Sequence, residues 1–188
     1  MSEGVEMSNL ARNCQWSFGV VALMWMIYAV GWVLPFDIKS FGIHPRELTG
    51  LLGVPFAPFI HASLTHLISN SVVLFVLLLI AVTYDKKALS SVIMVIILIG
   101  GLGTWIIGSG NSVHIGASGV IFGLMGYLLA VGYYRRDIKS IIVSIVIFFM
   151  YGGTILFSVF PAAGVSWSGH FFGFVAGILA VPRSVKNS

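Results

Sequence analysis

The sequence predicts an all-α membrane protein in which six transmembrane helices form a bundle with a long first extracytoplasmic loop. Three observations lead to this fold class: 58% of the 188 residues are hydrophobic, only 9% are charged, and the apolar residues fall into six long runs. Soluble domains carry about 25% charged residues, so a soluble fold is excluded. We expect one membrane domain over residues 1–188, with tails at 1–16 and 183–188 around a six-helix core at 17–182.

Six segments are apolar and long enough to cross a bilayer, because a helix needs roughly 20 mostly apolar residues for that. They cover residues 17–34, 64–83, 88–107, 115–134, 138–160 and 165–182. With both termini in the cytoplasm, eight of the ten Lys and Arg residues fall on the cytoplasmic side. Basic residues accumulate on that side. The sequence therefore predicts cytoplasmic termini, with the connections 35–63, 108–114 and 161–164 outside.

The net charge of +4 does not indicate a nucleic-acid-binding protein. The basic residues form no stripe and lie beside the apolar runs, where they set the orientation in the membrane. The single cysteine, Cys14, excludes a disulfide within the chain. We therefore expect membrane lipids, and no nucleic acid, among the partners of this protein.

The connection 35–63 is far longer than a turn requires, and it contains four prolines and four phenylalanines. Long loops in compact domains tend to be functional, and an ordinary surface loop is the alternative. We expect part of this loop to lie in the membrane interface. Its charged residues are interpreted as solvated: Asp37, Lys39, Arg46 and Glu47.

Polar residues at membrane depth mark the second run. His66 and Asn70 are four residues apart, so they share one helical face near the outer end, and His61 lies just above them. Polar groups in a bilayer are costly and usually face the bundle interior or a water-filled cavity. A buried polar group that bonds to a neighbouring helix is the alternative for each. We interpret the set as part of a polar cavity.

The third run ends in three glycines, Gly100, Gly101 and Gly103. Small residues of this kind favour close contacts between helices and carry no chemistry themselves, so we expect a structural role. Trp105 falls near the predicted end of the run and is interpreted as an interfacial anchor.

Ser118 is the first candidate for chemistry. The polar run 109–112 precedes it, so we expect Ser118 in the first turn of the helix that follows. The unpaired backbone N–H groups and the positive dipole end at that place suit an oxyanion on a carbonyl attacked by Ser118. The alternative is helix packing alone, because small residues surround the serine: Gly116, Gly119 and Gly123.

His170 is the second candidate. It lies in the sixth run beside Gly169, and glycine recurs at Gly173 and Gly177. Glycines on both helices let the fourth and sixth runs pack closely, which can bring the imidazole within about 3 Å of the Ser118 hydroxyl, as a general base requires. A satisfied core histidine and a proton-relay group are the alternatives. The matching glycine spacing favours catalysis.

Together these motifs resemble those of the rhomboid intramembrane serine proteases, in the bacterial form with a six-span core. The resemblance rests on three motifs that follow the family's order: His66 with Asn70, Gly116-Ala117-Ser118-Gly119, and Gly169-His170 with Gly173 and Gly177. It extends over nearly the whole chain, from the long first loop to the last run.

The resemblance implies a dyad in which Ser118 is the nucleophile and His170 is the base and then the acid. His66, Asn70 and the backbone N–H of Ser118 would form the oxyanion site, and His61 would belong to the same hydrated cavity. No cofactor and no metal are implied. The substrates would be transmembrane proteins whose helices are cut near the outer membrane face. A compact chain of this type is expected in a prokaryotic inner membrane.

Two features depart from the family's pattern. Many members carry a Trp-Arg pair in the first loop, whereas no Trp occurs between Val33 and Trp105, so the anchoring of this loop must differ. Phe122 stands where many members have a tyrosine. A phenyl ring can stack on His170 but cannot donate a hydrogen bond. Neither change removes a reacting group.

Other functions are weighed against this one. A catalytically inactive rhomboid-like protein that binds membrane helices is disfavoured, because both Ser118 and His170 are present. A transporter is disfavoured because the predicted membrane interior has no carboxylates and the sequence has no evident internal repeat. A metalloprotease is disfavoured because the sequence has no His-Glu-x-x-His motif. The sequence does not predict an oligomeric state.

Overall fold

The computed structural model describes residues 2–158, 160 and 165–186, and within them the chain is helical. The α-helices are α1 (Ser2–Gly31), α2 (Gly53–Phe56), α3 (Leu64–Ala81), α4 (Lys86–Ile107), α5 (Ser118–Arg135), α6 (Ile138–Ser158), α7 (Trp167–Leu179) and α8 (Arg183–Lys186). Three short 3-10 helices lie between α1 and α3: η1 (Ile38–Phe41), η2 (Leu48–Leu51) and η3 (Ala57–Phe59). The prediction of an all-helical protein is confirmed.

Local signals explain where several helices begin and end. Ser63 caps α3 by accepting a hydrogen bond from the backbone N–H of His66 at 3.2 Å. Asp85 caps α4 by accepting from the N–H of Ala88 at 2.9 Å. The fourth apolar run was predicted to be helical from residue 115, but α5 begins only at Ser118. Gly116 has a φ of +111°, which a helix cannot accommodate.

Four helical segments are long and apolar enough to cross a membrane: Ala11–Gly31, Leu64–Ala81, Lys86–Ile107 and Ile138–Phe157. The other two predicted crossings fall short in different ways. The 13 residues of α7 reach only about 20 Å, against about 30 Å of hydrocarbon. α5 has 18 residues but includes glycine, tyrosine and a terminal arginine, which lower its hydropathy. The count of six crossings therefore stays a prediction.

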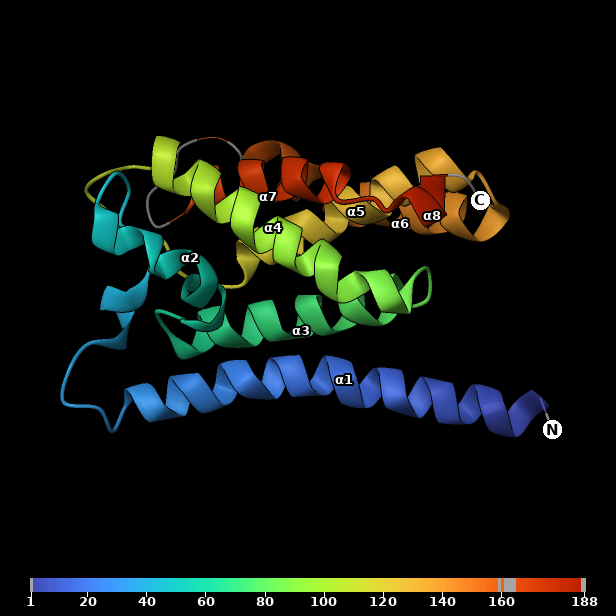
Figure 1. The fold of residues 1–188 in the computed structure, drawn as a ribbon, viewed down its shortest axis with the longest axis horizontal. Helices are drawn as coiled ribbons and strands as arrows, with labels where there is room; N and C mark the ends of the chain where they lie inside the picture. The colour runs from blue at the N-terminus through green and yellow to red at the C-terminus, as the bar shows by residue number, and fades with distance from the viewer. Residues whose placement is uncertain (1, 159, 161–164, 187–188) are drawn as a thin grey trace.

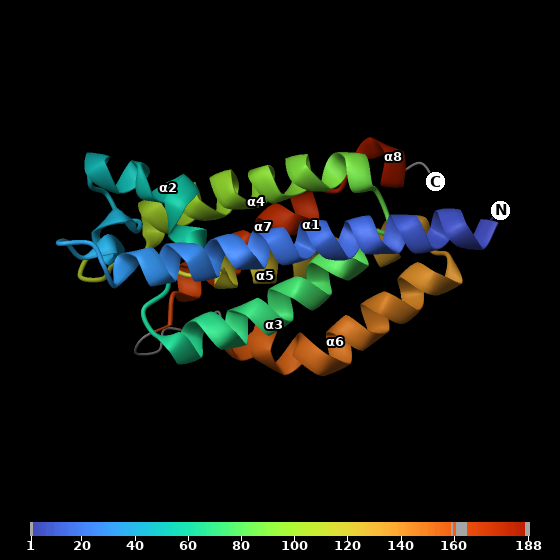
Figure 2. The ribbon, with the colours of Figure 1, turned by 90° about the horizontal axis from the view of Figure 1, so that it is seen from below.

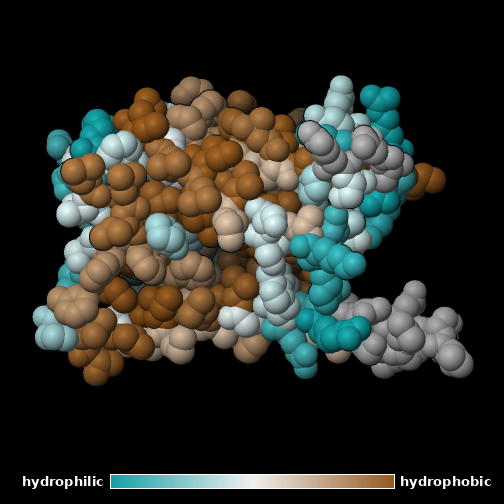
Figure 3. Space-filling model, viewed as in Figure 1, coloured by the Kyte–Doolittle hydropathy of each residue, from teal (hydrophilic) through white to brown (hydrophobic). Residues whose placement is uncertain are grey.

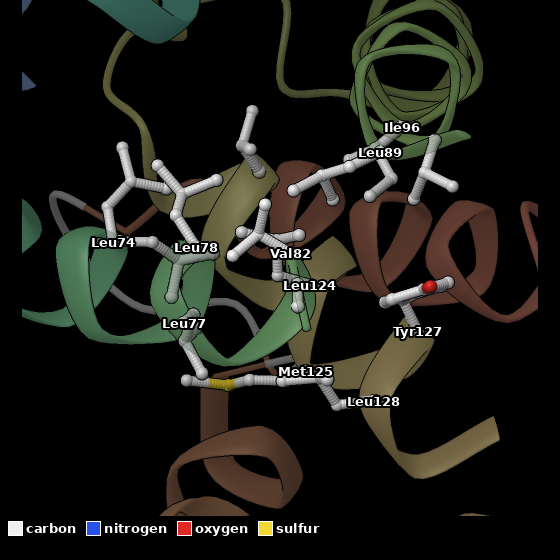
Figure 4. Packing of buried hydrophobic residues seen from close by; sticks show 14 of the residues in the cluster. Leu74, Leu77, Leu78, Val82, Leu89, Ile96, Leu124, Met125, Tyr127 and Leu128 are labelled. Carbon is white, nitrogen blue, oxygen red and sulfur yellow. The ribbon is translucent and has the colours of Figure 1, made fainter. Parts of the chain in front are cut away.

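α5 is the central helix. Most of its residues from Val120 to Gly132 are buried, and it contacts α3, α4, α6, α7 and α8. α1 lies along the opposite side of α3, at the edge of the bundle (Figures 1 and 2). Figure 4 shows the core beside α5, where side chains of α3 and α4 meet those of α5. Its fully buried members include Leu77, Leu78, Leu89, Leu124 and Leu128.

The outer surface of the bundle is apolar. On the face shown in Figure 3, hydrophobic residues cover the middle of the molecule and hydrophilic ones gather toward its two ends. Phe149 on α6 is 80% exposed and Val72 on α3 is 62% exposed. Such large apolar side chains are costly in water and favourable in lipid. This surface fits a membrane-embedded protein.

Glycines bring α5 and α7 into backbone contact. A Cβ atom on Gly173 would collide with the carbonyl oxygen of Gly119, and one on Gly177 would collide with that of Gly123. On the other side of α7, a Cβ on Gly100 would lie 3.2 Å from the Cα of Gly173. α7 is therefore held tightly between α4 and α5. The predicted close contact between the fourth and sixth runs is confirmed.

The loop between α1 and α3 is anchored to the end of α4. The Arg46 guanidinium donates to the carbonyls of Ile106 (3.1 Å) and Gly108 (2.8 Å), which the end of the helix leaves unpaired. The Trp105 indole N–H in turn donates to the carbonyl of Glu47 at 2.7 Å. Arg46 is exposed, which agrees with its interpretation as a solvated charge, but its guanidinium also bonds across to α4. A tryptophan and an arginine do fasten this loop, but the tryptophan comes from α4.

Candidate active site

A cavity of about 1270 Å³ opens where α3, α5, α6 and α7 meet. It receives the side chains that the sequence singled out on three of these helices: His66 and Asn70 from α3, Ser118 and Phe122 from α5, and His170 from α7. Tyr151 and Thr154 of α6 are also part of the wall. Residues more than a hundred positions apart are thus brought to one place.

Ser118 is the first residue of α5 and thus lies in the first turn of this helix, as the sequence predicted. The residue before it, Ala117, gives the helix no side-chain cap, so the first-turn N–H groups have no partner from that residue. The turn leading to Ser118 is fixed from behind, because the N–H of Gly116 donates to the carbonyl of Ala57 at 2.8 Å. The candidate nucleophile therefore lies at a helix N-terminus, and a hydrogen bond fixes the backbone of the turn before it.

His170 lies in the first turn of α7 and is only 9% exposed. Its imidazole stacks on the ring of Phe122, with centroids 4.1 Å apart and an angle of 7° between the planes. Phe122 is one helical turn after Ser118, so α5 supplies both the hydroxyl and the surface on which the imidazole rests. The stacking sets the plane of the imidazole.

His66 and Asn70 face the turn before Ser118. A Cβ on Gly116 would lie 2.6 Å from Cε1 of His66 and 3.5 Å from Nδ2 of Asn70. Gly116 is thus required both for its positive φ and for the space these side chains occupy. Asn70 is 7% exposed, and its Nδ2 has no hydrogen-bond partner among the described residues. A buried donor left unpaired costs about 1–3 kcal/mol, which suggests that it is kept for a ligand.

His61, which was expected to share the cavity, is not among the residues that line it. It is buried behind the Ser118 turn, where Nε2 accepts from the N–H of Ala117 at 3.3 Å. Because Nδ1 lies 3.3 Å from the carbonyl of Phe59, which can only accept, the hydrogen of the neutral ring is on Nδ1. His61 therefore positions the backbone next to Ser118.

The same contacts predict a pH-dependent stability. Burial, together with a smaller effect of the nearby His66, lowers the pKa of His61 from 6.5 to about 4. The unfolded chain then binds a proton at higher pH than the folded one, so this contribution to stability is fully present above pH 6.5 and is lost as the pH falls toward 4. His61→Gln keeps a donor and an acceptor but cannot titrate. Thermal unfolding midpoints in detergent should fall less between pH 7.5 and 5 for this variant than for the wild type. An identical fall in both proteins would contradict the assignment.

Sequence reasoning missed two polar residues at the site, His114 and Ser166. Both line the cavity, and their side chains are hydrogen bonded to each other with 2.6 Å between Nδ1 and Oγ. Neither recurs in a periodic pattern. The only available signal was the position of His114 four residues before Ser118. In the described part of the chain no group of three His, Cys, Asp or Glu side chains could hold a metal ion.

Comparison with known proteins places this architecture in a family. Residues 48–186 match the family model described as the rhomboid domain, which covers most of the chain. The chain belongs to the rhomboid family. The resemblance seen in the sequence motifs is therefore confirmed, and the apolar surface of the bundle agrees with the membrane-embedded nature of rhomboid proteins.

Three relatives illustrate the range of similarity. "Uncharacterized protein Rv1337" of Mycobacterium tuberculosis is 38% identical over 169 residues, which cover 85% of this chain and 70% of the relative. "Uncharacterized protein ML1171" of Mycobacterium leprae is 33% identical over 184 residues, which cover 90% of this chain and 72% of the relative. "Putative rhomboid protease YdcA" of Bacillus subtilis is 30% identical over 124 residues, which cover 64% of this chain and 60% of the relative.

Proposed function

We propose that this rhomboid protein is an intramembrane serine endopeptidase that cuts transmembrane helices near the outer membrane face. The observation that supports it best is that one cavity is lined by Ser118, His170 and Asn70, whose Nδ2 has no partner among the described residues. A hydroxyl, an imidazole and a buried donor are what acyl transfer needs. The proposed topology has six crossings with cytoplasmic termini in a cell membrane, and transmembrane proteins are the substrates.

In the proposed reaction, the Ser118 hydroxyl attacks the carbonyl carbon of the scissile peptide while His170 takes its proton. The imidazolium then gives the proton to the leaving amine, the C–N bond breaks, and an ester to Ser118 remains. Water that enters the cavity gives up a proton to His170 and attacks the ester carbonyl. The C–O bond to Ser118 then breaks, the acid product leaves, and the Ser118 oxygen takes the proton back from His170. No third, acidic residue is needed, since stacking on Phe122 orients the imidazole.

The oxyanion of each tetrahedral intermediate would be held by three groups. The backbone N–H of Ser118 lies at a helix N-terminus, which is the positive end of the helix dipole. Nδ2 of Asn70 and the ring of His66 approach from α3 on the side of Gly116. These donors are fixed before substrate arrives, so little reorganisation is needed as charge develops.

Asn70→Ala tests the oxyanion role. Loss of one of several donors should lower kcat by about 10–1000-fold with little change in KM. The thermal unfolding midpoint should not fall, because the variant removes a buried donor that has no partner in the described structure. The kcat and KM are measured with a tagged single-span substrate, and the thermal unfolding midpoint is measured on the detergent-solubilised enzyme. Thr65→Ala, an exposed polar-to-apolar change on the same helix, is the matched control. An unchanged kcat would remove Asn70 from this role.

The proposed function itself is tested by cleavage of a tagged single-span protein in liposomes. Wild-type protein should release two fragments whose junction lies near one end of the substrate helix. The variants Ser118→Ala and His170→Ala should release none. Binding of the substrate without release of fragments would favour the alternative, a catalytically inactive rhomboid-like protein that binds membrane helices.

A further inference from the structure

His114 is a buried histidine that neither the fold nor the proposed reaction explains. It lies in the loop between α4 and α5, four residues before Ser118, and is 7% exposed. Its backbone pairs with Ile43 in an antiparallel bridge, with both N–H to carbonyl distances at 3.0 Å. The loop in front of the nucleophile is thereby joined to the loop that Arg46 anchors on α4.

The hydrogen bonds around His114 fix its tautomer. Nε2 lies 3.3 Å from the carbonyl of Ser109, which can only accept, so Nε2 carries the hydrogen. In the neutral ring Nδ1 is then an acceptor, and the Ser166 hydroxyl donates to it at 2.6 Å. Burial lowers the pKa of His114, which agrees with a neutral ring. The bond to Ser166 is short and has a defined direction.

The Ser166 hydroxyl does not make the hydrogen bond that is usual for a serine at its position. It is the N-cap residue of α7, where serine normally bonds to the helix's own N–H groups, yet its side chain makes no capping bond. The hydroxyl bonds to His114 instead. The Ser166 carbonyl accepts from the N–H of His170 at 3.1 Å, in the turn that presents the imidazole. Ser166 thus connects the first turn of α7 to the loop before Ser118.

The His114–Ser166 pair also stands beside the nucleophile. A second, small cavity of about 50 Å³ lies behind the first. Four residues line both cavities: His114, Ile115, Ser118 and Ser166. The pair therefore forms part of the wall that also holds Ser118, and a shift of either partner would move the two reacting side chains relative to each other.

We propose that His114 is a positioning residue that holds the Ser118 loop and the His170 helix at their working separation through its hydrogen bond to Ser166. The role rests on the proposed function, since it gives the pair a purpose in proton transfer between Ser118 and His170. His114 touches no reacting atom. It acts four residues before the nucleophile and, through Ser166, four residues before the base.

Kinetics of single variants and of their combination test this role. His114→Ala should lower kcat by about 10–100-fold and leave KM within about twofold, because a misplacement near 1 Å costs about that much in rate. Ser166→Ala should give a similar loss, and the double variant should lose little more, since both remove one bond. His114→Asn, whose amide oxygen can replace Nδ1 as acceptor, should recover most of the rate. Full additivity of the two losses would overturn the proposal.

Ser112→Ala is the matched control. Its hydroxyl lies 3.2 Å from Nε2 of His114, on the side of the ring away from Ser166. The Ser109 carbonyl still accepts from Nε2 in this variant, so the tie to α7 is kept. The kcat should stay within about threefold of the wild type. A loss equal to that of His114→Ala would show that keeping the bond to Ser166 does not preserve the rate, and would also overturn the proposal.

Hydrogen exchange gives a readout that does not depend on turnover. In His114→Ala the backbone amides of residues 166–171 should exchange about fivefold faster, as expected for the loss of one hydrogen bond of about 1 kcal/mol, while those of α3 are unchanged. Unchanged protection in the first turn of α7 would overturn the positioning role. Failure of the wild type to cleave any substrate or to react with a fluorophosphonate would instead count against the proposed function. The exchange result would still show whether the hydrogen bond between His114 and Ser166 holds the first turn of α7.

Discussion

Cleavage of a single-span substrate should fall by on the order of 10⁴–10⁶-fold when Ser118 is replaced by alanine, and by a similar factor in His170→Ala. The two residues would act as one unit, because the hydroxyl is a weak nucleophile without the imidazole and the imidazole has nothing to activate without the hydroxyl. The double variant should therefore be no slower than either single one. Turnover is measured by fragment release in liposomes.

Two controls separate a loss of chemistry from a loss of fold. The catalytic variants should keep the thermal unfolding midpoint of the wild type in detergent. Ser91→Ala on the exposed side of α4 and His44→Ala in the first loop remove the same functional groups away from the cavity and should cleave normally. Retained cleavage in Ser118→Ala would reject Ser118 as the nucleophile, and in His170→Ala would reject His170 as the base.

The second large effect is expected on stability, from Gly177→Val in α7. A Cβ at this position would collide with the carbonyl oxygen of Gly123 and lie 2.9 Å from the backbone nitrogen of Tyr127. The neighbouring atoms are helix backbone and cannot move aside as a flexible side chain would. Overpacking of a core usually costs about 1–3 kcal/mol, and we expect this substitution to reach or exceed the upper end.

Gly153→Ala in α6 is the matched control, because a Cβ there meets nothing within 4 Å. Alanine is the better helix former by up to about 1 kcal/mol, so this variant should be as stable as the wild type or slightly more stable. Thermal or denaturant unfolding in detergent measures both variants. Equal unfolding midpoints for Gly177→Val and the wild type would mean that α5 and α7 are not in backbone contact.

The helices and the residues brought to the cavity could be predicted because their signals are local. Long apolar runs mark membrane helices by composition alone, and the spacing of Gly119, Gly123, Gly173 and Gly177 indicates which two helices meet. The helix ends were less predictable. They depend on single caps such as Ser63 and on one positive φ at Gly116, which hydropathy does not register.

The supporting contacts could not be predicted, because they join polar residues that are distant in sequence and follow no period. Arg46 looked like any charged residue in a loop until the structure placed it on the end of α4. His61 was expected in the cavity from its nearness to His66, yet its ring turns to the backbone of Ala117. His114 and Ser166 are 52 positions apart, and only the close packing of α5 against α7 brings them together.

The fastening of the first loop has a consequence for the route by which a helix from the bilayer could reach Ser118. Arg46, Trp105 and the bridge from Ile43 to His114 join that loop to the body of the protein at several points. On α6, by contrast, only 11% of the apolar window is buried, although Tyr151 and Thr154 border the cavity. We therefore expect a substrate helix of the proposed protease to enter on the α6 side, while the first loop stays fixed to the body of the protein.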